Sequence, residues 1–246
     1  MYGLVNEPKM IDLPRSAVIS WNTAAVSIIR AAGLVKPYLS FGDGFLKLSD
    51  WHGEFQNIDE QLIFDTHQYQ IFNANQLPLN YSARIALSCS GYQGLLLASN
   101  NPSSGWGPTM NGEWSQAETD CAPHLNNVGV GSRWTGTLNL GNTGLETNVL
   151  TPLCPTAPDC SCEMANADPS QYSNEYRKFL RMYAEAQMDS FEKVWGWFYW
   201  TWKTENAVQW SWLLGLRAGI LPEKVYGRGF RCGDVVPDFW DLSSGT

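Results

Sequence analysis

Short apolar segments alternate along the chain with longer stretches whose apolar residues recur at helical spacing. The first strand-like segment ends near Leu4-Val5, and the other four cover residues 37–41, 61–67, 109–114 and 196–204. The helix-like segments cover residues 16–32, 80–90, 173–194 and 210–217. Strands that alternate with helices in this way are typical of an α/β protein with a parallel sheet.

The helix predicted over residues 16–32 has one apolar face and ends at Gly33. That face is formed by Ala17, Trp21, Ala24, Ala25, Ile28 and Ile29. Residues 123–172 are instead rich in Gly, Asn, Thr and Pro and are predicted to be loop-like. A loop of this length in a compact domain is usually functional or cross-linked, and the cysteines at 154–162 offer the cross-links.

Composition narrows the class of protein. Of the 246 residues, 44% are hydrophobic and 16% charged, and the formal net charge is −8. The hydrophobic fraction excludes wholesale disorder, and the acidic balance argues against a nucleic-acid partner, which would require a basic patch. No run approaches the roughly 20 apolar residues of a membrane span, and the first residues lack the basic region of a signal peptide. The 12 Trp favour a carbohydrate site, because exposed aromatic faces stack on sugar rings.

The six cysteines suit three disulfides and an oxidising compartment. A structural metal site is the rival interpretation, but Cys160-Ser161-Cys162 is the only tight pair and lacks the spacing of a zinc knuckle. Asn80-Tyr81-Ser82 is the one usable N-glycosylation sequon and gives weak support for a secreted glycoprotein.

Polar and aromatic groups gather at the ends of the predicted strands. Glu7 follows the first strand, His67 ends the third, Glu113 lies in the fourth, and Trp200 and Trp202 lie in the fifth. In α/β barrels the carboxyl ends of the strands form the active site. Two glutamates at such positions, in a chain poor in charge, are therefore predicted to be catalytic.

Four motifs in order carry a resemblance to a known family. They are Asn6-Glu7-Pro8, His67-x-Tyr69, Gly112-Glu113-Trp114-Ser115 and Phe198-Tyr199-Trp200-Thr201-Trp202-Lys203-Thr204-Glu205. Together they resemble glycoside hydrolase family 5, in the fungal exo-β-1,3-glucanase (glucan 1,3-β-glucosidase) group. The segment 137–170 and the Trp-rich end most resemble the membrane-anchored branch of that group.

The resemblance implies a (β/α)8 TIM barrel and a role for each matching residue. Glu7 corresponds to the general acid/base and Glu113 to the nucleophile of a retaining glycosidase. Asn6 corresponds to the residue that bonds the 2-hydroxyl of the sugar, and His67 and Tyr69 to residues lining the −1 subsite.

The same resemblance assigns aromatic contacts and one disulfide. Phe72 corresponds to an aromatic that clamps the +1 sugar, and Trp200 to the −1 stacking platform, with Trp202 as the alternative. Cys89 would pair with Cys232. Cys121 would pair with Cys154, Cys160 or Cys162, and the remaining two with each other.

The implied activity is retaining, exo-acting hydrolysis of β-1,3-glucan that releases glucose in fungal cell-wall metabolism. It needs no metal and no cofactor, since the two carboxylates suffice. The expected partner is a β-glucan, and the expected location is extracellular or at the cell surface. The alternatives are a glucan-binding or inactive fragment, or a related β-1,6-glucanase or transglycosylase.

The position of the Asn-Glu-Pro motif along the chain departs from the family. Asn-Glu-Pro lies halfway along the family's barrel but at residue 6 here. Residues 1–246 are therefore predicted to be one catalytic domain that lacks its N-terminal half, from about strand four to strand eight. A membrane anchor of that branch would lie upstream of Met1. An open barrel exposes strand edges and apolar helix faces, so the isolated chain is predicted to self-associate and to have little activity.

Overall fold

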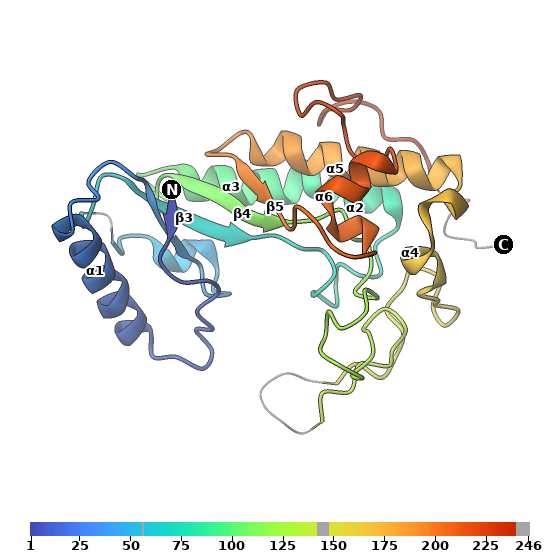
Figure 1. Cartoon of the computed structure of the whole chain (residues 1–246), viewed down its shortest axis with the longest axis horizontal. Coiled ribbons are helices and arrows are strands. Elements are labelled where there is room, and N and C mark those ends of the chain that lie inside the picture. The colour runs from blue at the N-terminus through green and yellow to red at the C-terminus, as the bar shows by residue number, and fades with distance from the viewer. Residues whose placement is uncertain (56, 142–147, 240–246) are drawn as a thin grey trace. The chain divides into compact units, whose positions relative to one another are not determined.

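The computed structural model describes residues 1–55, 57–141 and 148–239. Its main elements are β1 (Tyr2–Gly3), α1 (Arg15–Ala31), β2 (Leu39–Gly42), η1 (Leu48–Trp51), β3 (Leu62–His67), α2 (Tyr81–Leu87), η2 (Ser88–Tyr92), α3 (Gln93–Asn100), β4 (Thr109–Trp114), α4 (Glu163–Asn166), η3 (Pro169–Gln171), α5 (Asn174–Phe191), β5 (Trp197–Tyr199), η4 (Val208–Trp210) and α6 (Trp212–Arg217) (Figure 1). No helix among these residues combines the length and the apolar character that a bilayer crossing requires.

The chain forms two compact units. The first contains residues 1–68, 91–113 and 190–198, and the second contains residues 69–90, 114–189 and 199–246. The predicted boundary of a single domain over residues 1–246 stays a prediction.

The strands form one five-stranded sheet in the order β1-β2-β3-β4-β5. β1 to β4 pair in parallel, and β5 adds beside β4 through the bond from Asn111 N to Gly196 O, 3.0 Å. In a doubly wound sheet the strand order reverses at a switch point, whereas here each strand follows its predecessor. A parallel sheet of this order, with its helices, is compatible with part of an α/β barrel.

An aromatic cluster forms the core of the first unit, on the side of the sheet that carries Phe41 and Phe64. Phe41 stacks on Phe64 at a ring-centroid distance of 4.9 Å. The other members are Trp51, Phe55 and Trp106. All five side chains are buried, so this cluster fixes β2 and β3 against the segments that follow them.

Helix α1 begins and ends one residue before the predicted positions, but its predicted face is wrong. The buried residues are Val18, Asn22 and Val26, whereas Trp21 is 51% and Ile28 68% exposed. The helix has more apolar residues than one face can bury, so their spacing does not select the buried stripe. Asn22 tolerates burial because its side chain donates to Val18 O within the helix.

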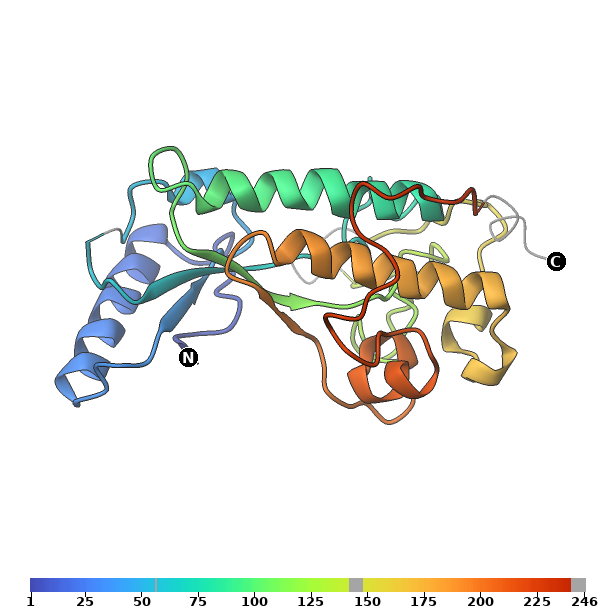
Figure 2. The ribbon, with the colours of Figure 1, turned by 90° about the horizontal axis from the view of Figure 1, so that it is seen from above.

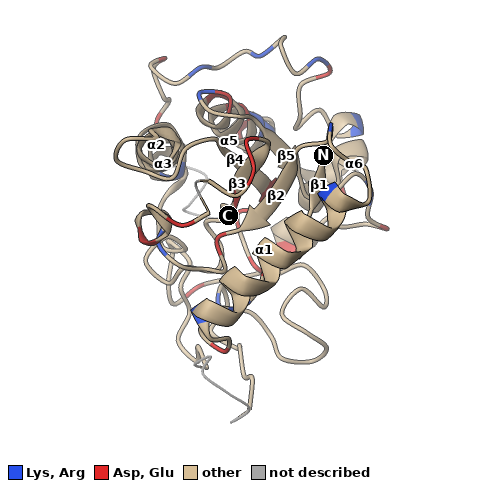
Figure 3. Ribbon diagram, turned by 90° about the vertical axis from the view of Figure 1, so that its left-hand side faces the viewer, with Lys and Arg blue, Asp and Glu red and all other residues tan. Residues whose placement is uncertain are grey.

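Charged residues are sparse along the ribbon, and the two arginines of α1 lie near its ends (Figure 3). Arg30 donates to both carboxylate oxygens of Asp59 at 2.6 and 2.9 Å. This bond holds the pKa of Asp59 below its usual range and ties the end of α1 to the segment before β3.

The helix predicted over residues 80–90 continues to Asn100 as α2, η2 and α3. Asn80 caps α2 because its side chain accepts from Ala83 N. Gly91 and Gly94 suggest a helix end in the sequence, but Gly91 lies in the π-helical turn η2 and Gly94 in α3, so the helical backbone continues. The predicted strand 196–204 is shorter than expected, because Thr201 N bonds to Trp210 O rather than to the sheet.

The second unit packs α5 against α2 and the C-terminal segment (Figure 2). Its core contains Phe179 and Tyr183 of α5, Ile85 of α2 and Phe230. The carboxylate of Glu185 accepts from the backbone N–H groups of residues 229 and 230. The C-terminal segment is therefore anchored to α5 by both apolar and polar contacts.

Three disulfides lie in the second unit. Cys89 pairs with Cys232, as the resemblance implies. The two pairings that the sequence left open are Cys121–Cys162 and Cys154–Cys160. They cross-link the loop-like segment 123–172, which also contains the short helices α4 and η3. Its residues 142–147 lie outside the described structure.

Candidate active site

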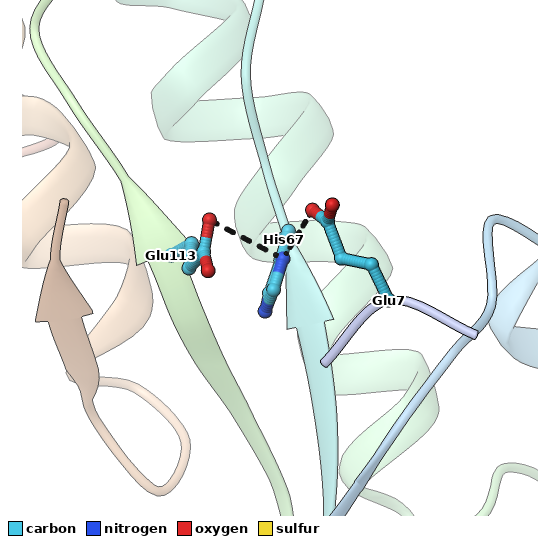
Figure 4. Close-up of side chains that lie close together, drawn as sticks. All are labelled: Glu7, His67 and Glu113. Atoms are coloured by element: carbon cyan, nitrogen blue, oxygen red, sulfur yellow. Dashed lines mark hydrogen bonds and ion pairs between the residues drawn. The ribbon is translucent and has the colours of Figure 1, made fainter. Parts of the chain in front are cut away.

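Three of the predicted site residues meet at the carboxyl ends of strands in the first unit (Figure 4). His67 is the last residue of β3, Glu113 lies one residue before the end of β4, and Glu7 lies in the loop after β1. The parallel strands place these ends along one edge of the sheet. Residues from three distant parts of the sequence therefore share one site.

The His67 imidazole lies between the two glutamates. Its Nδ1 is 2.7 Å from Glu7 Oε1 and 3.5 Å from Glu113 Oε2. One carboxylate oxygen of Glu7 and one of Glu113 lie within 4.8 Å of each other. The two carboxylates are thus close enough to act on opposite sides of a single bond.

A bulge in β4 brings Glu113 onto the face of His67. Thr66 pairs with Asn111 and His67 with Glu113, so Gly112 is an extra residue on β4. Successive side chains of a regular strand alternate between faces, and Asn111 and Glu113 would then share the face opposite to His67. A bulge re-aims one side chain in this way, and here it turns Glu113 toward the imidazole.

The loop that carries Glu7 is held by the neighbouring loop after β2. Met10 N bonds to Gly44 O at 3.3 Å, and Pro8 is buried. Glu7 itself has a positive φ of 42°, a conformation that costs energy for a residue other than glycine and is often found at functional sites. The side chain of Glu7 is 37% exposed, so a ligand can reach it.

His67 carries a positive charge at neutral pH. Burial opposes that charge, but the carboxylates of Asp65, Glu7 and Glu113 outweigh burial and raise the pKa of His67 to about 10. Asp43, at the end of β2, also faces this group, and burial raises the pKa of Asp43. The site is therefore a cluster of carboxylates around one imidazolium.

Glu7, His67 and Glu113 also offer three ligand atoms within 4.8 Å of one another, a spacing that could hold a metal ion. An imidazole coordinates a metal through a nitrogen lone pair. The neighbouring carboxylates raise the pKa of His67, and a metal ion would have to displace a ring proton to coordinate there. The arrangement suits acid–base and nucleophilic chemistry better than a metal centre.

The predicted aromatic contacts Tyr69 and Phe72 lie in the second unit. Their rings meet edge to face at a centroid distance of 5.5 Å. The Arg133 guanidinium covers the Phe72 ring at 5.6 Å, and Phe72 is 43% exposed. Trp210, which the sequence analysis missed, packs on Tyr69 at 5.5 Å. Trp210 begins the predicted helix 210–217, so the sequence did not indicate it as a site residue.

Trp200 and Trp202 also belong to the second unit, and both are exposed. Backbone bonds fix the segment that carries them: Trp200 N bonds to Trp114 O at 2.9 Å, and Leu213 N bonds to Trp202 O at 3.0 Å. Asn6 is exposed directly before Glu7. Asp65, beside His67, was not predicted, although its i, i+2 spacing on the strand could have indicated it.

The chain is similar to proteins named probable glucan 1,3-beta-glucosidase D. It is 49% identical over 245 residues to those from Aspergillus fumigatus and Aspergillus terreus, and 45% identical over 244 residues to that from Aspergillus niger. Each match covers 98% of this chain and 28% of the relative, so the chain spans little more than a quarter of the length of these curated relatives. No protein-family model matches it. Over nearly all of its own length, the chain is homologous to part of these Aspergillus proteins.

Proposed function

We propose that this chain carries the two catalytic carboxylates of a retaining β-1,3-glucan hydrolase. Glu113 is the nucleophile and Glu7 the general acid/base. The observation that carries the proposal is their spacing, with carboxylate oxygens within 4.8 Å. Retaining glycosidases separate their two carboxyl groups by about 5–5.5 Å, and inverting enzymes by about 6.5–9.5 Å.

The reaction proceeds in two displacements. Glu113 attacks the anomeric carbon and forms a glycosyl ester while the glycosidic C–O bond breaks, and Glu7 donates its proton to the leaving oxygen. Water then attacks the same carbon, gives its proton to Glu7 and releases Glu113. The His67 Nδ1–H bond to Glu7 holds the acid/base in place during both steps.

The substrate is a β-1,3-glucan, in keeping with the names of the relatives. The chain acts as part of a fungal glycoside hydrolase family 5 exo-enzyme of the membrane-anchored branch, built on a (β/α)8 barrel. Asn6 bonds the 2-hydroxyl, and the remaining sugar contacts come from Tyr69, Phe72, Trp200 and Trp202. Three disulfides suit such an enzyme outside the cell.

The first test is glucose release from laminaritriose by the 246-residue chain, with the anomer of the new reducing end followed by NMR. We expect turnover by the isolated chain to be low, the β-anomer to form first, and turnover to fall by about 10³-fold or more in Glu113→Gln. Glu175→Gln, on the exposed first turn of α5, is the matched control and should keep the activity of the unchanged chain. Laminarihexaose tests the exo mode, which predicts glucose and laminaripentaose as first products.

A second test identifies the nucleophile directly. A 2-deoxy-2-fluoro-glucosyl fluoride should leave a covalent glycosyl ester on Glu113, located by peptide mass spectrometry. An α-anomer product, an ester on another residue, or unchanged turnover in Glu113→Gln would refute the proposed mechanism. Laminarin binding without turnover or ester formation would favour the second candidate, a glucan-binding chain, for which the exposed Phe72, Trp200 and Trp202 are the observation.

A further inference from the structure

Asp65 faces the imidazole of His67 from the side opposite to Glu7. The two residues are two positions apart on β3 and so share a face of the sheet. Asp65 Oδ2 lies 3.8 Å from His67 Nε2, an ion-pair distance, whereas His67 Nδ1 bonds to Glu7. The imidazole is therefore held between carboxylates at both of its nitrogens.

Gly112 makes room for the Asp65 carboxylate. A Cβ atom added at Gly112 would lie 2.1 Å from Asp65 Oδ1 and 2.4 Å from Oδ2, and its three nearest atoms would all belong to Asp65. Contacts this short do not occur, so an alanine would displace the carboxylate. Gly112, which forms the β4 bulge, therefore also leaves room for the Asp65 carboxylate beside His67.

The carboxylate of Asp65 is confined rather than solvated. Its side chain is 17% exposed, and within the described part of the chain Oδ1 is buried without a hydrogen-bond partner. A buried carboxylate oxygen without a partner is costly, and the nearby imidazolium is the positive charge that offsets this cost. This arrangement indicates that Asp65 acts through His67.

We propose that Asp65 is a positioning residue that keeps the His67 imidazole doubly protonated and oriented toward Glu7, and that Gly112 is glycine because this carboxylate needs its space. The catalytic role of Asp65 rests on the proposed function, but its effect on the protonation of His67 can be measured without turnover. It requires only that His67 respond to Asp65.

Four carboxylates bear on this imidazole, from four elements. Asp65 lies on β3 itself, Glu7 on the loop after β1, Glu113 on β4, and Asp43 at the end of β2. Glu7 and Glu113 must change charge or bonding during the reaction. Asp65 instead faces Nε2, the ring nitrogen that does not bond to Glu7.

The test is an NMR titration of the histidines in the full 246-residue chain. The sequence has only three, His52, His67 and His124, so His67→Gln assigns the signal of interest. We expect Asp65→Asn to lower the proton affinity of His67 by about tenfold or more, which is one pKa unit. Asp12→Asn, an exposed residue of the loop before α1, is the control and should leave the titration unchanged.

A double-mutant cycle covers the case in which Asp65→Asn fails to fold. Gly112→Ala should destabilise the chain strongly when Asp65 is present and far less in the Asp65→Ala background, because the clash is with that carboxylate. An unchanged His67 titration in Asp65→Asn, or additive effects in the cycle, would overturn the proposal.

Activity separates this proposal from the proposed function. If the function holds, Asp65→Asn should lower kcat about tenfold with little change in KM, and should move the alkaline limb of the pH–rate profile to lower pH. If Glu113→Gln leaves turnover intact, the proposed function fails. The His67 titration would still decide the role of Asp65 in that case.

Discussion

Truncation of Phe41 gives the sharpest stability test of the first unit. Phe41 on β2 is 1% exposed. Its ring contacts those of Trp51, Phe55, Phe64 and Trp106 at centroid distances of 5.5, 4.7, 4.9 and 5.0 Å. Phe41→Ala removes the one ring that touches all four others.

The expected loss combines lost burial with an unfilled cavity. Phe→Ala substitutions in cores cost about 3–5 kcal/mol, and aromatic pairs contribute about 0.5–1.5 kcal/mol each beyond burial. With four ring contacts, Phe41 belongs near the upper end, at about 4–5 kcal/mol. That loss is about a thousandfold in the folding equilibrium and comparable to the whole stability of a weak domain.

The assay is equilibrium urea unfolding followed by Trp fluorescence. Phe45→Ala is the matched control, because Phe45 is only four residues away and 61% exposed, and its effect should stay within about 0.5 kcal/mol. Phe41→Leu, which keeps most of the volume, should fall between the two. A Phe41→Ala loss below about 1 kcal/mol would refute the conclusion that this aromatic cluster holds the first unit together.

Two further perturbations address the cross-links and the charges. Cys89 and Cys232 are 143 residues apart, and Cys154 and Cys160 only 6. Loop-closure entropy therefore predicts losses of about 5 and about 2 kcal/mol when each pair is changed to Ala; equal losses in urea unfolding would contradict this ranking. The ion pair of Asp59 lowers the pKa of its carboxyl, so its stabilisation is present above the unfolded pKa of about 3.9 and is lost as the pH falls through the folded value. Asp59→Asn should therefore be less stable than wild type at pH 6 and lose less stability on acidification; an equally steep acid loss would show that Asp59 does not contribute.

The sequence predicted the positions of most elements because their apolar periodicity is strong. β4 has the predicted bounds, and α1 and α5 differ from prediction only near their ends. The buried face of α1 could not be predicted, since Trp21 and Val26 are both apolar and only packing distinguishes them. The continuation from α2 to Asn100 was missed because two glycines resemble a helix end.

In the candidate site too, some residues could be predicted from the sequence near them, whereas others depend on contacts between strands. Motifs indicated Glu7, His67 and Glu113, and the structure brings these three together. Asp65 belongs to none of the motifs, and its role depends on the space that Gly112 of the neighbouring strand leaves for its carboxylate. Such a pair is defined by sheet register, which strand sequences specify only through their packing.

The bulge at Gly112 also has a consequence for how related sequences are aligned. Loops tolerate insertions and deletions well, so a gap within residues 123–172 says little about chemistry. A gap of one residue between Thr109 and Glu113 would instead remove the extra residue of β4, and a regular strand would then pair the glutamate that follows Asn111 with His67 on the same face. In a collection of homologues, such a gap would mark chains that reach the same glutamate position without a bulge, and in which no residue corresponds to Gly112.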